Sequence, residues 1–107
     1  MGTLYIVGTP IGNLEDLSPR AARILGQAGL VAAEDTRVTR RLLNYLGIHP
    51  RLTSFHQHNY QEKLDLLLRA LGEGDVALVT DAGMPGVSDP GSELVGRAAL
   101  EGFAVES

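Results

Sequence analysis

The sequence predicts an α/β fold, namely a parallel five-stranded sheet with helices on both faces. Three observations lead to this prediction. Short apolar runs alternate with stretches of helical spacing along the 107 residues, which is the pattern of consecutive β-α units. The runs are largely apolar at successive positions, as in strands that are covered on both sides. The 13 Gly and 5 Pro residues fall mostly between these segments and separate them.

Five apolar runs are the expected strands. They are short, and each is followed by a turn, a cap or a polar segment. Right-handed crossovers between such strands place the connecting helices on the faces of the sheet. The expected strands are Leu4–Val7, Leu30–Ala33, Leu52–Phe55, Val76–Thr80 and Phe103–Val105.

The first two helices carry clear start and stop signals. Ser18 caps the first helix, and Pro19 occupies its first turn, where a proline needs no backbone donor. Thr36 is expected to cap a second helix over residues 37–46. Gly47 follows its last turn, as glycine commonly does at the end of a helix.

The third and fourth helices are expected from weaker signals. Asn59 and Glu62 have the spacing of a capping box, which predicts a helix that runs to about Leu71. Ser92 is expected to open the last helix, which ends at Leu100.

The segments that follow the strands are the candidate site. In open parallel sheets, ligands bind beyond the carboxyl ends of the strands. The functional residues are therefore expected in loops 8–13, 34–37, 56–59 and 81–91.

Composition excludes several classes of protein. The chain has no cysteine, which rules out disulfide scaffolds, thiolate zinc sites and cysteine nucleophiles. No apolar run approaches the roughly 20 residues of a membrane span, and the first residues do not resemble a signal peptide. A cytoplasmic protein without a membrane partner is therefore expected.

Charge is unevenly distributed along the chain. The formal net charge is −4, but residues 20–51 hold six arginines and two acids, which gives +4. The rest of the chain holds three basic residues and eleven acids, which gives −8. A locally basic segment can bind an anion although the whole chain is acidic.

Two of the post-strand loops are rich in glycine and proline. Loop 8–13 lacks the dinucleotide-binding spacing, and no Gly-Lys-Ser/Thr sequence of a P-loop occurs in the chain. Loop 81–91 contains three Gly and two Pro and is long for a β-α connection, which favours a function over a plain connection. A backbone wall of this kind suits a flat ligand held by main-chain groups.

Arginines form a stripe on the second expected helix. Arg37, Arg40, Arg41 and Asn44 are spaced so that they share one face. Three guanidinium groups in a row suit contacts with a phosphate backbone, although a charged stripe is also typical of an ordinary solvated helix face. The opposite, apolar face is expected to consist of Val38, Leu42, Tyr45 and Leu46.

Histidines follow the third expected strand. His56 and His58 could place two imidazoles on one side of an extended segment, but no third metal ligand lies nearby in the sequence. No metal is therefore expected. Contact with a substrate, or general-base catalysis by one imidazole, fits the pattern better.

Four motifs together resemble the tetrapyrrole methylase family, and most closely its branch of ribosomal small-subunit RNA 2′-O-methyltransferases, which act on a cytidine. The motifs are Gly8-Thr-Pro-Ile-Gly-Asn13, Ala33-Glu-Asp-Thr-Arg37, Ser54-Phe-His-Gln-His-Asn59 and Thr80-Asp-Ala-Gly-Met-Pro-Gly-Val-Ser-Asp-Pro-Gly91. The resemblance implies a protein of two α/β domains with S-adenosylmethionine (AdoMet) in the cleft between them. Residues 1–107 would be the N-terminal domain, and the C-terminal domain would be absent.

The resemblance also implies roles for individual residues. The cofactor would be lined by the first loop and the glycine-rich fourth loop, where this chain has Met84 in place of the aspartate found in much of the family. The cofactor-binding residues would be Thr9, Pro10, Ile11, Gly83, Met84, Pro85, Gly86 and Val87.

The other two motifs would face the substrate, which is 16S rRNA in the small ribosomal subunit, and the full-length protein would be a homodimer. Substrate contacts would come from Glu34, Arg37, Arg40, Arg41, His58 and Asn59. A ribose hydroxyl needs a base that removes its proton, and the candidates are Asp35, His56 and Asp81.

Two other functions stay open at the level of the sequence. One is a methylase of the same family that acts on a tetrapyrrole or another small molecule, which would not need the arginine stripe. The other is a nucleotide-binding module without catalysis, because Glu34 lies about 20 residues after Gly12, where a dinucleotide fold keeps its ribose-binding acid.

Overall fold

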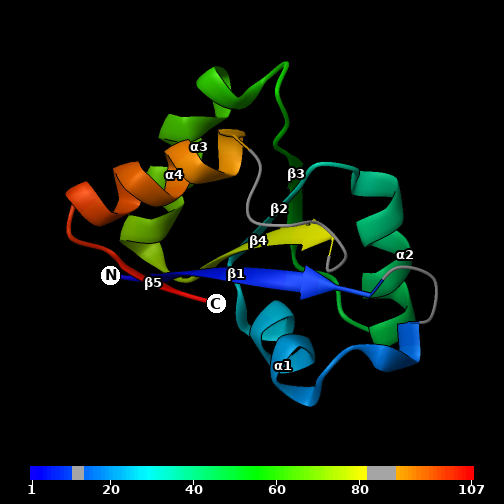
Figure 1. Ribbon diagram of the computed structural model, residues 1–107. Coiled ribbons are helices and arrows are strands. Elements are labelled where there is room, and N and C mark those ends of the chain that lie inside the picture. The colour runs from blue at the N-terminus through cyan, green and yellow to red at the C-terminus, as the bar shows by residue number, and fades with distance from the viewer. Residues whose placement is uncertain (11–13, 82–88) are drawn as a thin grey trace.

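Residues 1–10, 14–81 and 89–107 are described by the computed structural model. They form one sheet of five parallel strands in the order β3-β2-β4-β1-β5 (Figure 1), which confirms the predicted fold class. The strands are β1 (Thr3–Thr9), β2 (Leu30–Ala33), β3 (Arg51–Ser54), β4 (Val76–Asp81) and β5 (Ala104–Glu106).

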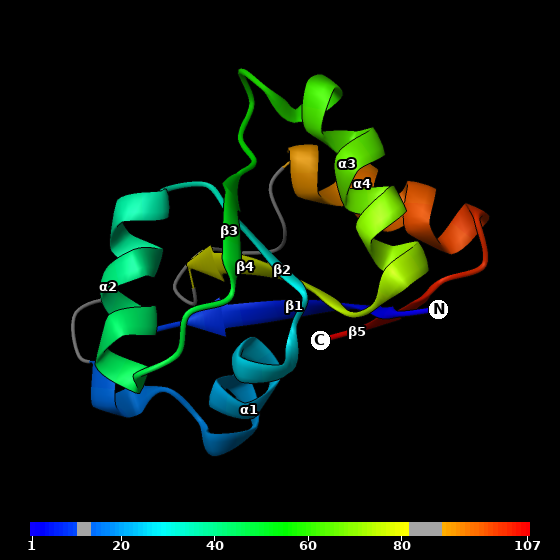
Figure 2. The ribbon, with the colours of Figure 1, turned by 180° about the vertical axis from the view of Figure 1, so that it is seen from behind.

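Four α-helices within the described residues cover the sheet on both faces. Helices α1 and α2 lie on one face and α3 and α4 on the other, as two opposite views show (Figures 1 and 2). A short 3₁₀ helix, η1 (Leu14–Asp16), precedes α1. The helices are α1 (Pro19–Gln27), α2 (Thr36–Leu46), α3 (Tyr60–Glu73) and α4 (Asp89–Leu100).

Each face of the sheet has its own apolar core. Successive side chains of a strand point to opposite faces, so Val31 packs in the core beneath α1 and α2, whereas Ala32 packs in the core beneath α3 and α4. All four residues of β2 are buried. Burial on both faces explains why β2 is apolar at every position.

The strands next to the site run further than the sequence predicts. β1 continues through Gly8 and Thr9 because its pairing with β4 continues, with Gly8 opposite Thr80 and Thr9 opposite Asp81. At the other end of loop 81–91, α4 begins at Asp89 and not at Ser92. Both glycine-rich loops are therefore shorter than expected.

Among the predicted helix caps, Thr36 is wrong, Asn59 has the predicted position without a capping hydrogen bond, and Ser18 and Gly47 are confirmed. The Asp35 carboxylate, not Thr36, accepts a hydrogen bond from the backbone N–H of Arg37 at 3.0 Å and so caps α2. Asn59 precedes α3 but its side chain does not cap that helix. Ser18 caps α1, since its hydroxyl accepts from the N–H of Ala21, and Gly47 ends α2 with a left-handed φ of 72°.

The predicted apolar face of α2 is also wrong in part. Leu42 is buried as expected, but its buried neighbours are Thr39 and Leu43. Val38 and Tyr45 are 47% and 54% exposed. At about 100° per residue, the buried residues lie opposite the arginine stripe, whereas Val38 and Tyr45 lie on its flank.

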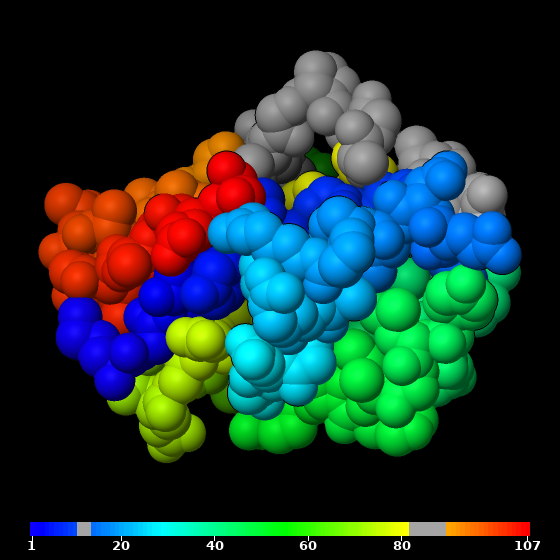
Figure 3. All heavy atoms as spheres, turned by 90° about the horizontal axis from the view of Figure 1, so that it is seen from below, coloured from blue at the N-terminus to red at the C-terminus, as the bar shows by residue number. Residues whose placement is uncertain are grey.

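An ion pair and a hydrogen bond connect the end of the chain, at the edge strand β5, to α1. Arg20 of α1 lies 3.6 Å from the Glu106 carboxylate and donates a hydrogen bond to the carbonyl oxygen of Ser107 at 3.2 Å. Figure 3 shows the end of the chain, in red, beside the beginning of α1, in light blue. Both charged side chains are about half exposed, so the pair adds little stability.

Candidate functional site

The carboxyl ends of β1 and β4 lie side by side, although about 70 residues separate them in the sequence. The Thr9 hydroxyl donates a hydrogen bond to the carbonyl oxygen of Thr80 at 3.1 Å. Thr9 is also the register partner of Asp81. The two strands therefore end next to each other, at Thr9 and Asp81.

The connections that follow these two strands go to opposite faces of the sheet. β1 leads to α1 on one face, and β4 leads to α4 on the other (Figure 1). Ligands of open α/β sheets bind where the connections after two neighbouring strands go to opposite faces, because a crevice forms between the two connections.

A ledge of exposed backbone lies at this point of divergence. Gly8 and Thr80 are register partners, and strand alternation puts both positions on the face of Ile6 and Leu78, which pack with α3 and α4. Gly8 is exposed and Thr80 is half-buried. Because Gly8 has no side chain, a ligand can approach the backbone closely here. We call this pair the Gly8–Thr80 ledge.

The structure places only some of the expected cofactor-binding residues. Thr9 is buried and Pro10 is half-buried at the end of β1. The other expected cofactor contacts lie outside the described residues, and they are Ile11, Gly83, Met84, Pro85, Gly86 and Val87.

The three candidate bases differ in whether their side chains already accept a hydrogen bond. Asp81 is exposed at the end of β4, beside Thr9. Asp35 uses one carboxylate oxygen to cap α2, and the same oxygen lies 3.8 Å from Nε of Arg37. His56 accepts a hydrogen bond on Nδ1 from the backbone N–H of His58 at 3.2 Å. Of the three, Asp81 lies nearest to the ledge along the sheet.

Asn59 organises the turn between β3 and α3. Its side-chain oxygen accepts from the backbone N–H of His56 at 2.8 Å, and its amide nitrogen donates to the Ser54 hydroxyl at 2.8 Å. The rings of His56 and His58 are edge-to-face with centroids 5.8 Å apart. Asn59 is therefore committed to the turn, whereas the exposed His58 ring remains available to a ligand.

The arginine stripe lines a shallow hollow on α2. Arg37, Arg40 and Arg41 surround a volume of about 250 Å³ together with Thr36 and Asn44. The Arg37 side chain is 90% exposed, and its neighbour Asp35 is its ion-pair partner. Within the described residues, Arg40 and Arg41 form no ion pair. We call these three arginines the arginine patch. Glu34 is exposed just before α2, at the same edge of the sheet.

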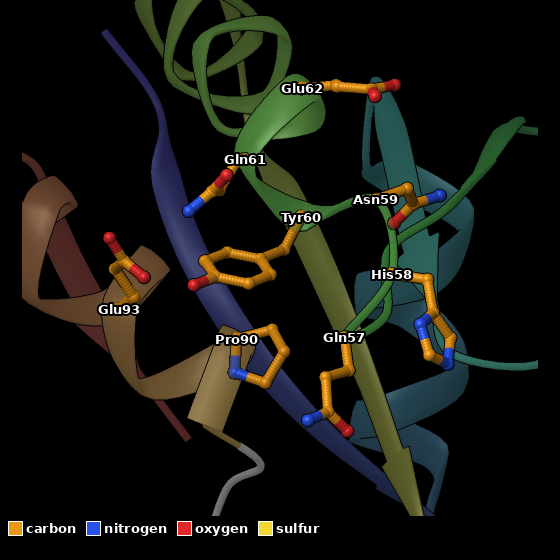
Figure 4. A pocket seen from close by; sticks show the side chains of 8 residues that line it. All are labelled: Gln57, His58, Asn59, Tyr60, Gln61, Glu62, Pro90 and Glu93. Carbon is orange, nitrogen blue, oxygen red and sulfur yellow. The ribbon is translucent and has the colours of Figure 1, made fainter.

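A larger hollow of about 450 Å³ lies between the beginnings of α3 and α4 (Figure 4). It faces the same edge of the sheet as the ledge, because both helices begin where β3 and β4 end. Its lining residues are Gln57, His58, Asn59, Tyr60, Gln61, Glu62, Pro90 and Glu93.

The described part of the chain contains neither a cluster of metal ligands nor a membrane-spanning helix. No group of three or more His, Asp or Glu side chains there could hold a metal ion. No helix there is long and apolar enough to cross a membrane.

Known proteins resemble this chain over almost its whole length. The family of Tetrapyrrole (Corrin/Porphyrin) Methylases matches residues 3–107. The chain belongs to the tetrapyrrole methylase family. A solved diphthine synthase has the same fold, with a TM-score of 0.73 and 17% identity over 98% of this chain and 43% of the other.

Curated relatives of this methylase chain carry one shared name, Ribosomal RNA small subunit methyltransferase I. The protein from Halalkalibacterium halodurans is 55% identical over 97% of this chain. The one from Escherichia coli O157:H7 is 50% identical over 97% of this chain. The chain spans 36% and 37% of the length of these two relatives.

Sequence reasoning found about half of the lining of the larger hollow, because loops 56–59 and 81–91 contain Gln57, His58, Asn59 and Pro90. It missed the other lining residues, which fall in the predicted helices, namely Tyr60, Gln61, Glu62 and Glu93. The residues come from two segments about 30 positions apart, and no local pattern shows that α3 and α4 pack side by side. A signal was nevertheless present, since polar residues cluster around the single aromatic Tyr60.

Proposed function

We propose that this chain is the AdoMet-binding part of a methyltransferase that 2′-O-methylates a cytidine ribose in 16S rRNA. One observation carries the proposal: the Gly8–Thr80 ledge lies at the edge of the sheet at which α2, the helix that bears the arginine patch, begins. The relatives' name supports ribosomal RNA as the substrate. The cytidine and the 2′-oxygen follow from the branch of the family that the four motifs resemble.

The ledge fits the cofactor. A flat adenosyl group needs close approach to backbone, and the exposed Gly8 beside Thr80 offers such a surface. Thr9 and Pro10 would hold AdoMet from β1. Residues 83–87 and Ile11 would complete the site. AdoMet, when bound, supplies the methyl group from a positively charged sulfur.

The chain's own residues would position the ribose and accept its proton. Correct positioning of two reacting groups can lower a barrier by about 7–11 kcal/mol, and a general base typically contributes about 10²–10⁴-fold. Asp81 is the favoured base because it is exposed beside the end of β1. Asp35 and His56 are less favoured, since each already accepts a hydrogen bond from the backbone.

The arginine patch would hold the RNA backbone. Arginine side chains bind phosphate through several N–H donors, and such contacts fix the position of a nucleic acid without reading its sequence. Glu34 and His58 would contact the RNA near the same edge, whereas Asn59 would act through the turn that it holds. A cytoplasmic location and a homodimer are proposed with this substrate.

Replacing Arg37, Arg40 and Arg41 with alanine tests the proposal in the full-length protein that carries this sequence. Methyl transfer from labelled AdoMet to small ribosomal subunits should fall strongly. The slope of log affinity for RNA against log salt should flatten by about two, because each lost contact with a single strand contributes about 0.7.

A matched variant controls for net charge. Arg23, Arg51 and Arg69 are exposed on α1, β3 and α3, and their replacement by alanine removes the same charge elsewhere. This control should retain the salt slope. Equal slopes for both triple variants would contradict the RNA assignment. Transfer to a tetrapyrrole but not to ribosomal subunits would favour the small-molecule alternative, and failure to bind AdoMet would favour the non-catalytic module.

A further inference from the structure

The hollow between α3 and α4 extends from His58 and Asn59 to side chains that have no role in the proposed function, among them Gln57, Tyr60 and Glu93. Its wall combines the turn before α3 with the first turns of both helices. In Figure 4 the Tyr60 ring lies at the centre of the labelled side chains, and its hydroxyl points to the side on which Glu93 lies. His58, Asn59 and Glu62 point to the opposite side.

Four polar side chains in the wall of the hollow have no hydrogen-bond or ion-pair partner among the described residues. Within the described residues, the side chains of Gln57, Tyr60, Gln61 and Glu93 form no hydrogen bond or ion pair. This differs from the neighbouring turn, where His56 and Asn59 are tied to each other and to the backbone. The hollow therefore offers free donors and acceptors around an aromatic ring.

The chemistry of these groups selects the ligand. The Glu93 carboxylate only accepts hydrogen bonds when ionised, whereas the amides of Gln57 and Gln61 both donate and accept. The half-buried Tyr60 ring supplies flat apolar surface, and the buried Pro90 ring lies beside it in the wall. A phosphate would be repelled by Glu93, and a metal would lack ligands among the described residues. A flat, neutral group with an N–H donor beside acceptors matches all of these features.

We infer that the hollow binds a nucleobase with an exocyclic amino group, supplied by the RNA strand whose phosphates contact the arginine patch; this inference rests on the proposed function. Glu93 accepts from the amino group, as acidic side chains do with cytosine. Tyr60 stacks on the base, as aromatic side chains do with single strands. α2 and α3 lie on opposite faces of the sheet but begin at the same edge, after the neighbouring strands β2 and β3, so the RNA strand would cross this edge to contact both the patch and the hollow.

The test measures binding of labelled single strands of cytidine, adenosine or uridine, each about twelve nucleotides long, to the full-length protein by fluorescence anisotropy. Tyr60→Leu keeps apolar packing but loses stacking, so cytidine and adenosine strands should bind about five-fold or more weakly. Tyr60→Phe should stay within about two-fold. Glu93→Gln should weaken the same two strands by a similar factor and leave uridine unchanged or stronger, because an amide can donate to a keto oxygen.

Glu73→Gln is the matched control for charge. Glu73 is exposed at the far end of α3, away from the hollow, and its replacement should change none of the three affinities. A general electrostatic effect would instead strengthen binding equally in Glu73→Gln and Glu93→Gln.

Three outcomes would overturn the inference. If Tyr60→Leu and Glu93→Gln bind RNA like the wild type while the arginine triple variant loses it, the hollow does not hold a base and the proposed function stands. If both variants lose affinity for AdoMet in calorimetry but bind RNA normally, the hollow holds the adenine base of the cofactor and not a base of the RNA. If the wild type binds none of the strands and does not methylate ribosomal subunits, the proposed function fails as well.

Discussion

At Gly2, the close packing of the chain against the end of α3 leaves no room for a side chain. Its N–H donates to the carbonyl oxygen of Leu71 at 2.7 Å, and a Cβ at its position would overlap the carbonyl group of Gly74. Gly2→Ala must therefore push the beginning of β1 away from the end of α3. We expect the variant to lose about 1–3 kcal/mol of free energy of unfolding, measured by urea unfolding followed by circular dichroism.

Gly72→Ala provides the control at the same scale. Gly72 is exposed in α3, and a Cβ there meets nothing within 4 Å. Alanine stabilises such a helix position by about 0.5–1 kcal/mol relative to glycine. Similar losses in both variants would mean that the close approach at Gly2 is not what limits the substitution.

At the scale of the element, variants of Asp35 distinguish its role as the cap of α2 from a role in catalysis. Its carboxylate accepts the N–H of Arg37 at 3.0 Å, and asparagine can keep that hydrogen bond whereas alanine cannot. Asp35→Ala should cost about 0.5–2 kcal/mol of stability, and Asp35→Asn should cost little. With Asp81 as the base, Asp35→Asn should keep methyl transfer within a few-fold, and Asp81→Asn should lose about 10²–10⁴-fold.

Stability and activity together decide between the two carboxylates. Urea unfolding reports the cap, and transfer of label to small ribosomal subunits reports the base. A loss of 100-fold or more in Asp35→Asn with unchanged stability would make Asp35 the base and contradict the assignment of Asp81.

At the scale of the whole molecule, the cofactor site is expected to need more than this chain. The Gly8–Thr80 ledge lies at the carboxyl ends of β1 and β4, and the chain spans little more than a third of the length of the two curated relatives. We propose that a second domain closes the site in the full-length protein. Calorimetry should therefore show AdoMet binding at least about ten-fold weaker to residues 1–107 alone, because one wall of the pocket is lost. Equal affinity would contradict a site between two domains.

The local features were predictable because they depend on neighbouring residues. β2 follows from four successive apolar residues, and the confirmed helix ends follow from the hydroxyl of Ser18 and the conformational freedom of Gly47. The predicted cap at Thr36 was wrong because the side chain of Asp35 competes for that role, and the predicted capping hydrogen bond of Asn59 was wrong because its own side chain is used elsewhere. Asp35 caps α2 instead, and Asn59 is used by the turn before α3.

The sequence by itself determined the presence of the five strands, the helix ends at Ser18 and Gly47, the arginine spacing and the family. Only the tertiary structure decided the strand order, which brings Thr9 beside Asp81, the buried face of α2, and the hollow that Tyr60 and Glu93 share. The physical reason is the separation in sequence between the residues that interact. Backbone conformation responds to adjacent residues, whereas strand order and helix contacts depend on the packing of the whole sheet, which no local pattern contains.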